Sequence, residues 1–152
     1  MTPAEPVGEP LVRHTGHLLR RAQQVHTAVW QRDVSTQVTS VQYAVLSVLR
    51  ARPGASQAEL GAELVLDRST VADLVVRMTG RGLIAREQDP TDRRRKVLTL
   101  TADGRAKLAD LRPKVDGLEP VLTAGLTDDD AVEFRRMLQT ILDAAGESEL
   151  VD

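Results

Sequence analysis

Residues 56–101 constrain the fold more than any other part of the chain. Ser56 and Asp67 each precede a short stretch with apolar residues at helical spacing, and both residue types are favoured helix N-caps. Glu59 follows Ser56 by three residues, so we expect a capping box there. The second stretch ends at Gly80-Arg81-Gly82, which suits a left-handed helix end. Two short helices with a tight connection predict a helix-turn-helix.

The residues that follow predict a β-hairpin with a basic tip. LIAREQ (83–88) and KVLTLT (96–101) are rich in aliphatic and β-branched residues, which favour strands. DPTDRRR (89–95) lies between them and combines turn residues with three arginines. A helix-turn-helix followed by such a hairpin is a winged helix-turn-helix.

Amphipathic helices are predicted on both sides of this unit. A helical pattern begins at Leu11, and its apolar arc is so broad that we expect much of the helix to be buried. Thr39 caps a helix that Arg52-Pro53-Gly54 stops. From Thr101 an apolar seam repeats about every 3.5 residues and calls for a partner helix, while Pro113 and Pro120 should kink or end it. Its apolar members are Leu108, Leu111, Val115, Leu118 and Leu122, and Thr127 begins a last amphipathic helix.

The predicted fold is mainly α with a small β-hairpin wing, the terminal helices forming a dimerisation lobe. The expected regions are a flexible arm (1–10), an N-terminal dimerisation and ligand helix region (11–38), the winged helix-turn-helix DNA-binding domain (39–102), C-terminal dimerisation helices (103–146) and a tail (147–152). The apolar faces of the terminal helices are too extensive for a two-helix lobe, which favours a homodimer. Closure of these faces into an intramolecular bundle is the alternative.

Charge distribution points to double-stranded DNA as the partner. The chain has a formal net charge of −2, yet the segment from Arg77 to Lys107 holds nine basic residues against four acidic ones. A recognition helix over 67–79 would present its first turn to base edges in the major groove, and the wing would place an arginine, oriented by Asp92, in the minor groove. The predicted DNA contacts are Arg68, Ser69, Thr70, Arg77, Asp92, Arg93, Arg94 and Arg95.

Several other classes of protein lack support in the sequence. The chain has no cysteine, which excludes thiol chemistry and disulfides, and we predict no cofactor and no metal site. No nucleophile elbow, phosphate-binding glycine loop or carboxylate cluster indicates an enzyme. No apolar run is long enough for a membrane span and the N-terminus does not resemble a signal peptide, so we expect a cytoplasmic protein without a membrane partner. A winged-helix protein that acts only through protein contacts is disfavoured by the intact Arg68-Ser-Thr and Arg93-Arg94.

Four segments resemble the MarR family of winged helix-turn-helix regulators: TSVQYAVL (39–46), LDRSTV (66–71), RGLI (81–84) and, above all, DPTDRRRKVLTLTADG (89–104). The resemblance implies an obligate homodimer with intertwined terminal helices. It also implies binding to a pseudo-palindromic operator, with release when a small phenolic or carboxylic ligand binds between the lobes. Gly61 stands where the family usually has alanine, which should loosen that helix slightly.

A candidate ligand site lies in the first helical region, which holds all three histidines and the only tryptophan. At 100° per residue His26 falls beside Trp30 while Arg20 projects away from them, so one helix does not bring them together. In an intertwined dimer, an arginine of one subunit can face a pocket of the other and bind a carboxylate beside an imidazole and an aromatic wall. Alternatively, His26 and Trp30 simply pack in a core.

A closer resemblance favours the ligand site. GHLLRRAQQVH (16–26), followed by Trp30, is similar to the first helix of MarR-family repressors that respond to protocatechuate in actinobacterial aromatic catabolism. This implies that Arg20 binds a carboxylate, with His26, Trp30 and His17 completing the candidate site and an aromatic carboxylate such as protocatechuate or a related hydroxybenzoate as effector. A different phenolic, antibiotic-like or metal effector is the alternative, although His14 and His17 have no evident third metal ligand.

Overall fold

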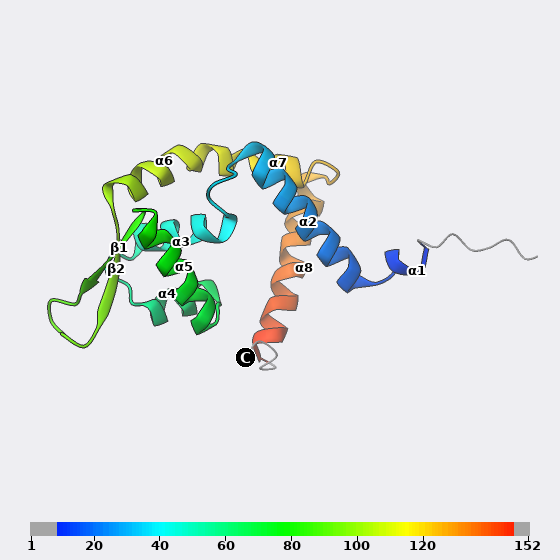
Figure 1. The fold of residues 1–152 in the computed structure, drawn as a ribbon. Helices are drawn as coiled ribbons and strands as arrows, with labels where there is room; N and C mark the ends of the chain where they lie inside the picture. Colours follow the sequence, from blue (N-terminus) through cyan, green and yellow to red (C-terminus); the bar gives the residue numbers. More distant parts are fainter. Residues whose placement is uncertain (1–8, 148–152) are drawn as a thin grey trace, which may run out of the picture.

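The chain forms two groups of helices joined by one long helix. The computed structural model describes residues 9–147, so most of the predicted arm (1–10) and tail (147–152) lies outside the described residues. Figure 1 shows α3, α4, α5 and the hairpin at one end, α2, α7 and α8 at the other, and α6 between them. The elements are α1 (Glu9–Val12), α2 (Thr15–Asp33), α3 (Ser40–Ala51), α4 (Gln57–Leu64), α5 (Arg68–Gly80), β1 (Ile84–Gln88), β2 (Lys96–Leu100), α6 (Ala102–Asp116), α7 (Leu118–Leu122) and α8 (Asp128–Glu147).

The predicted winged helix-turn-helix is confirmed, and its helices begin at the predicted caps. Thr39 and Gln42 form a complete capping box on α3. The Ser56 hydroxyl accepts the backbone N–H of Glu59 at 3.2 Å, as predicted. The other half of that box was predicted wrongly, because the Glu59 carboxylate bonds to Arg95 of the wing instead.

The hairpin is held to the helices by backbone bonds. β1 and β2 are antiparallel, with Ile84 opposite Leu100 and Gln88 opposite Lys96. Leu98 donates its N–H to the carbonyl of Ala55 at 2.8 Å and accepts the N–H of Gly54 at 3.0 Å. The base of the wing is therefore attached to the segment that leads into α4.

One hydrophobic core fills the lobe formed by α3, α4, α5 and the hairpin. α5 buries Val71, Val75 and Met78 on one face, so its opposite face stays in solvent. Gly61 allows α4 and α5 to approach closely, since a Cβ there would lie 3.1 Å from Val71 Cγ2 and 3.2 Å from the carbonyl of Leu66. This glycine therefore permits the close packing of the two helices.

A second core joins the two ends of the molecule. Trp30 is 5% exposed and its indole Nε1 donates to the carbonyl of Val38 at 2.7 Å. Around it pack Val34 from the α2–α3 linker, Leu111 from α6 and Leu118 from α7. Part of the predicted seam of α6 and α7 thus finds a partner within the same chain.

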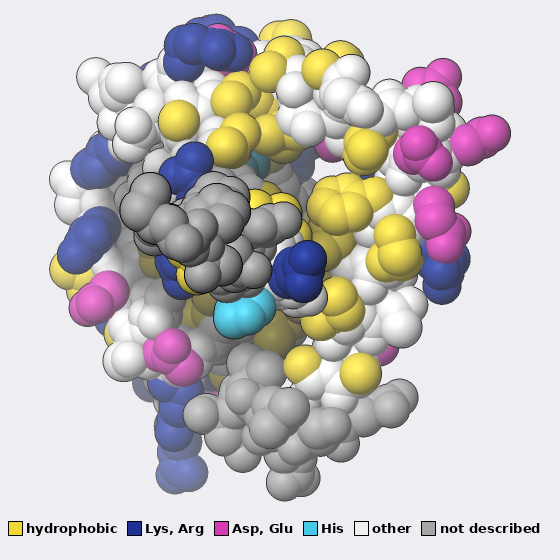
Figure 2. All heavy atoms as spheres, turned by 90° about the vertical axis from the view of Figure 1, so that its right-hand side faces the viewer, with side chains coloured by type: hydrophobic (Ala, Val, Ile, Leu, Met, Phe, Trp, Pro, Cys, Tyr) yellow, Lys and Arg dark blue, Asp and Glu magenta, His cyan; other side chains and the backbone are white. Residues whose placement is uncertain are grey.

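The terminal helices leave extensive apolar faces uncovered. Trp30 is the buried residue of α2, so the expectation that much of this helix is buried is wrong for the single chain. The pattern marked a face suited to burial, but no described helix covers it. Figure 2 shows hydrophobic side chains gathered on this side of the molecule. Those exposed on α2 and α8 are Leu18, Leu19, Val25, Val132, Phe134, Met137, Ile141 and Leu142. Among the described residues, no helix is long and apolar enough to cross a membrane.

The start of α6 packs against the turn before β1. The Thr101 hydroxyl, which also caps α6, donates to the carbonyl of Gly82 at 2.6 Å. A Cβ on Gly104 would lie only 1.9 Å from the carbonyl oxygen of Leu83. Gly104, the last residue of the DPTDRRRKVLTLTADG segment, therefore cannot be replaced by a residue with a Cβ unless the backbone moves.

We predict that Gly104→Ala destabilises the protein, because the added methyl collides with a backbone oxygen that has no rotamer to change. The expected loss is about 3 kcal/mol in the free energy of unfolding, measured by urea denaturation. Gly80→Ala is the control, since no atom lies within 4 Å of a Cβ there. Equal stability of the two variants would contradict the packing argument.

The cap of α5 generates a prediction about pH. Hydrogen bonds from the Thr70 backbone N–H and from the Ser69 and Thr70 hydroxyls lower the pKa of Asp67 from 3.8 to about 2. A lowered folded-state pKa stabilises the fold above pH 3.8, and this stabilisation is lost as pH falls toward 2. Wild type should therefore be more stable than Asp67→Asn at pH 6, and the difference should shrink in thermal unfolding between pH 4 and pH 2.5. A difference that is constant with pH would show that the carboxylate charge is not what caps α5.

Candidate functional site

The outward face of α5 carries the predicted recognition residues. Arg68, Ser69 and Arg77 are exposed and Thr70 is half-buried. The hydroxyls of Ser69 and Thr70 each donate to a carboxylate oxygen of Asp67 at 2.8 Å. In this arrangement they keep lone pairs but no free hydrogen, so they can accept from base amino groups but cannot donate to a phosphate.

Sequence analysis missed two further residues on this face. Asp73 is exposed, and Val76 is 68% exposed although it is apolar. They lie four and seven residues after Ser69, so helical spacing from Ser69 would have identified both. A carboxylate can accept from the cytosine amino group, and a valine can contact a thymine methyl.

A broad groove of about 1100 Å³ runs beside the start of α5, between α4 and α5. Val65, at the turn of the helix-turn-helix, borders it with φ at 53°, and Gln57 borders it with a buried side-chain oxygen that has no hydrogen-bond partner. Arg68 lines the same groove. The groove is thus part of the surface that the recognition helix presents.

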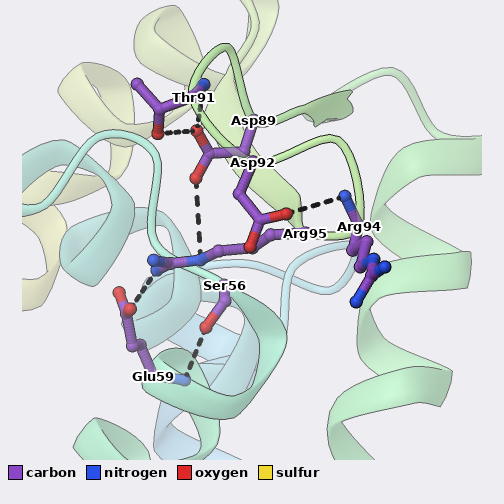
Figure 3. Close-up of polar contacts among 7 residues, drawn as sticks. All are labelled: Ser56, Glu59, Asp89, Thr91, Asp92, Arg94 and Arg95. Atoms are coloured by element: carbon purple, nitrogen blue, oxygen red, sulfur yellow. Dashed lines mark hydrogen bonds and ion pairs between the residues drawn. The ribbon is translucent and has the colours of Figure 1, made fainter.

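The wing loop is organised by two aspartates. Asp89 accepts the Thr91 backbone N–H at 2.9 Å and the Thr91 hydroxyl at 2.8 Å, and these bonds lower its pKa, with a smaller contribution from Arg95. Asp92 accepts the backbone N–H of Arg94 at 3.0 Å. Asp92 was expected to orient an arginine side chain, but its carboxylate instead holds the backbone of the turn through the Arg94 N–H (Figure 3).

The three wing arginines occupy different environments. Arg93 and Arg94 are exposed, and Figure 3 shows the Arg94 side chain directed away from the carboxylates. Arg95 is half-buried; its guanidinium bonds to Glu59 of α4, and its Nε lies 3.9 Å from Asp89 Oδ2. The chain thus presents two wing guanidiniums to solvent and holds the third against α4.

Two of the four candidate ligand residues, Arg20 and Trp30, line two adjoining depressions beside α2. Arg20 donates to Nδ1 of His17 at 2.9 Å and lines an open depression of about 430 Å³ with Gln23, Gln24, Thr27, Ala28 and Gln31. Trp30 lines a smaller pocket of about 210 Å³ toward the α2–α3 linker. Thr27 and Gln31 line both, so the two depressions adjoin each other along α2.

His26 lies apart from Arg20 in the single chain. It borders neither depression, and its ring centroid is 6.2 Å from that of Trp30. The structure therefore places His26 beside Trp30 and away from Arg20, as the helical spacing predicted, and it also brings Arg20 to His17, which was not predicted. Within residues 9–147, no group of three or more His, Asp or Glu side chains is arranged to hold a metal ion.

Comparison with known proteins agrees with this geometry. A family model described as MarR family matches residues 36–95. The transcriptional regulator HosA of Escherichia coli is 34% identical over 128 residues, which cover 84% of this chain and 94% of HosA.

Solved structures match over a similar range. The PcaV transcriptional regulator of Streptomyces coelicolor, in complex with its natural ligand, is 41% identical with a TM-score of 0.84, covering 89% of this chain and 96% of PcaV. BpsR of Bordetella bronchiseptica, whose DNA binding is regulated by 6-hydroxynicotinic acid, is 31% identical with a TM-score of 0.81. The match covers 91% of this chain and 97% of BpsR. The transcriptional repressor CouR, bound to a 23-mer DNA duplex, is 33% identical with a TM-score of 0.79. The match covers 91% of this chain and 99% of CouR. With such relatives along most of its length and a winged helix-turn-helix that exposes basic residues, the chain belongs to the MarR family and is a DNA-binding transcriptional repressor.

Proposed function

We propose that this repressor is a homodimer that binds a pseudo-palindromic operator and releases it when a hydroxylated aromatic carboxylate binds beside α2. Protocatechuate and related hydroxybenzoates are the proposed effectors. The observation that carries this proposal is Arg20, an exposed guanidinium that bonds to the ring of His17 and not to a carboxylate, and whose depression adjoins the pocket lined by Trp30. Guanidinium groups bind carboxylates through paired hydrogen bonds, and an indole offers an apolar wall for a ring.

The chemistry of a relative's effector supports the ligand class. The 6-hydroxynicotinic acid that regulates BpsR carries a carboxyl and a hydroxyl group on an aromatic ring. PcaV, with 41% identity, was solved with its natural ligand bound. An aromatic acid at Arg20 would need further walls in addition to the open face of α2, and a second subunit with its own His26 can supply them.

Exposed apolar residues support the homodimer. Phe134, Met137 and Ile141 are between 41% and 49% exposed on one face of α8, and Leu18 and Val25 of α2 are exposed to a similar degree. Burial of such faces against a second copy would remove large apolar area from water. A two-fold dimer also places two recognition helices on half-sites about one DNA turn apart.

The proposed DNA contacts divide by groove. Arg68 on the first turn of α5 reaches base edges in the major groove, with Ser69 and Thr70 as acceptors, and Arg77 contacts a phosphate. Arg93 and Arg94 enter the minor groove, where the negative potential attracts guanidinium groups. Both are exposed, as this role requires.

The α2–α3 linker provides a route between ligand and DNA. Trp30 of α2 donates to the carbonyl of Val38 in this linker. The neighbouring linker residue, Gln37, accepts a bond at 2.6 Å from Arg81 at the end of α5. A ligand that displaces α2 would therefore move a segment bonded to the recognition helix. Coupling of about 1–3 kcal/mol would weaken operator binding several-fold to about a hundredfold.

The dimer is tested by a charge on the apolar face of α8. Ile141→Asp should give a monomer in analytical ultracentrifugation and lose most operator affinity, because a carboxylate would be buried at the interface. Thr140→Asp, one residue away and off this face, should remain dimeric. A dimeric Ile141→Asp protein would place the interface elsewhere.

The ligand site is tested by Arg20→Ala. This variant should bind operator DNA like wild type but bind protocatechuate about 10–100-fold more weakly in calorimetry, since it loses hydrogen bonds to a charged group. Its DNA complex should no longer dissociate when the acid is added. Arg21→Ala is the control, because Arg21 bonds to Gln24 and does not line the depression. If Arg20→Ala is released from DNA as readily as wild type, the site assignment is wrong.

A further inference from the structure

The wing is attached to the helices at two points of different chemistry. At its base, the backbone bonds between Leu98 and residues 54–55 form part of the sheet network. Near its tip, Arg95 bonds through its side chain to Glu59 on the first turn of α4. The loop that carries Arg93 and Arg94 begins beyond the backbone attachment, so the side-chain attachment is what limits its movement relative to α4.

Both ends of this side-chain contact are fixed in place. Ser56 caps α4 by accepting the Glu59 backbone N–H, which holds Glu59 in the first turn. On the wing, the Arg95 carbonyl accepts the N–H of Asp89 at 2.9 Å, and the Arg95 N–H donates to the carbonyl of Asp92 at 3.1 Å. Arg95 therefore closes the loop through its backbone. Its side chain joins the loop to α4 (Figure 3).

The guanidinium of Arg95 lies between two carboxylates. Glu59 bonds to Nη2, and Asp89 Oδ2 is 3.9 Å from Nε. A phosphate that approached this group would compete with both acids, whereas Arg93 and Arg94 have no such partner in the described part of the chain. The three arginines thus carry the same charge but are not equivalent toward DNA.

We propose that Arg95 is a positioning residue, which sets the height and angle of the wing through Glu59, and that it does not contact DNA itself. The Arg95–Glu59 pair would then favour the wing position from which Arg93 and Arg94 reach the minor groove, and its loss would weaken that contact without abolishing it. This inference rests on the proposed role of the wing in DNA binding.

The test compares variants by fluorescence anisotropy on the duplex that the wild-type protein protects in the promoter beside its own gene, from 50 to 300 mM KCl. The variants are Arg95→Gln, the charge swap Glu59→Arg with Arg95→Glu, and Arg93→Gln as the contact control. Arg95→Gln should weaken binding about two- to fivefold, the range for an exposed ion pair, with little change in the slope of log Kd against log salt. The swap should restore most of the affinity, because it rebuilds the pair with reversed charges, although the new carboxylate at position 95 faces Asp89. Arg93→Gln should reduce the slope by about 0.9, the value for one lost phosphate contact.

Three results would overturn the inference. A slope reduced by about 0.9 in both Arg95→Gln and the swap, without rescue, would make Arg95 a phosphate contact. Wild-type affinity and slope for Arg95→Gln would show that the pair has no positioning role. An unchanged affinity and slope for Arg93→Gln would show that Arg93 does not contact DNA, which would contradict the proposed role of the wing. Thermal unfolding of each variant checks that the wing, still held by Leu98 and Ala55, remains folded.

Discussion

The buried hydrogen bond from Trp30 to the carbonyl of Val38 is the constraint on which the arrangement of the two lobes depends. A buried indole N–H without a partner would cost free energy, so Trp30 holds the α2–α3 linker close to α2. Leu111 and Leu118 pack on the same side chain and bring α6 and α7 to it. The helix proposed to bind the effector is thereby joined to the helices that carry the DNA-binding lobe. Trp30 is then both a core residue and a wall of the pocket next to Arg20.

Three carboxylates organise the DNA-facing surface while they are themselves paired with protein donors. Asp67 uses its oxygens on the first turn of α5, Asp89 on the wing turn, and Glu59 on Arg95. Each of these acids is occupied by protein donors. Arg68 and Arg93 remain exposed for the phosphates and bases of the operator. The division between organising acids and exposed cations explains how a chain with net charge −2 presents a basic surface.

The helix starts could be predicted from sequence because they depend on local contacts. Features that depend on contacts between distant residues could not. Caps such as Ser56 and Asp67 act over three residues, so the helix starts followed from the sequence. The Glu59–Arg95 pair joins residues 36 apart and conflicts with the local capping-box pattern, which is why Glu59 was assigned wrongly. The apolar arc of α2 indicated a face suited to burial but not which chain would cover it. The division of Arg20 from His26 followed from helical geometry alone, whereas the two adjoining depressions that share Thr27 could be found only in the structure.

The most direct test of the account is the anisotropy of labelled promoter DNA from beside the protein's own gene, titrated with wild-type protein in the presence and absence of aromatic acids. Protocatechuate, other hydroxybenzoates and 6-hydroxynicotinate form the panel. The account predicts salt-sensitive binding that one of these acids weakens several-fold to about a hundredfold. Tight binding that none of them weakens would contradict the coupling between α2 and the recognition helix, and binding no stronger than to random DNA would contradict operator recognition itself.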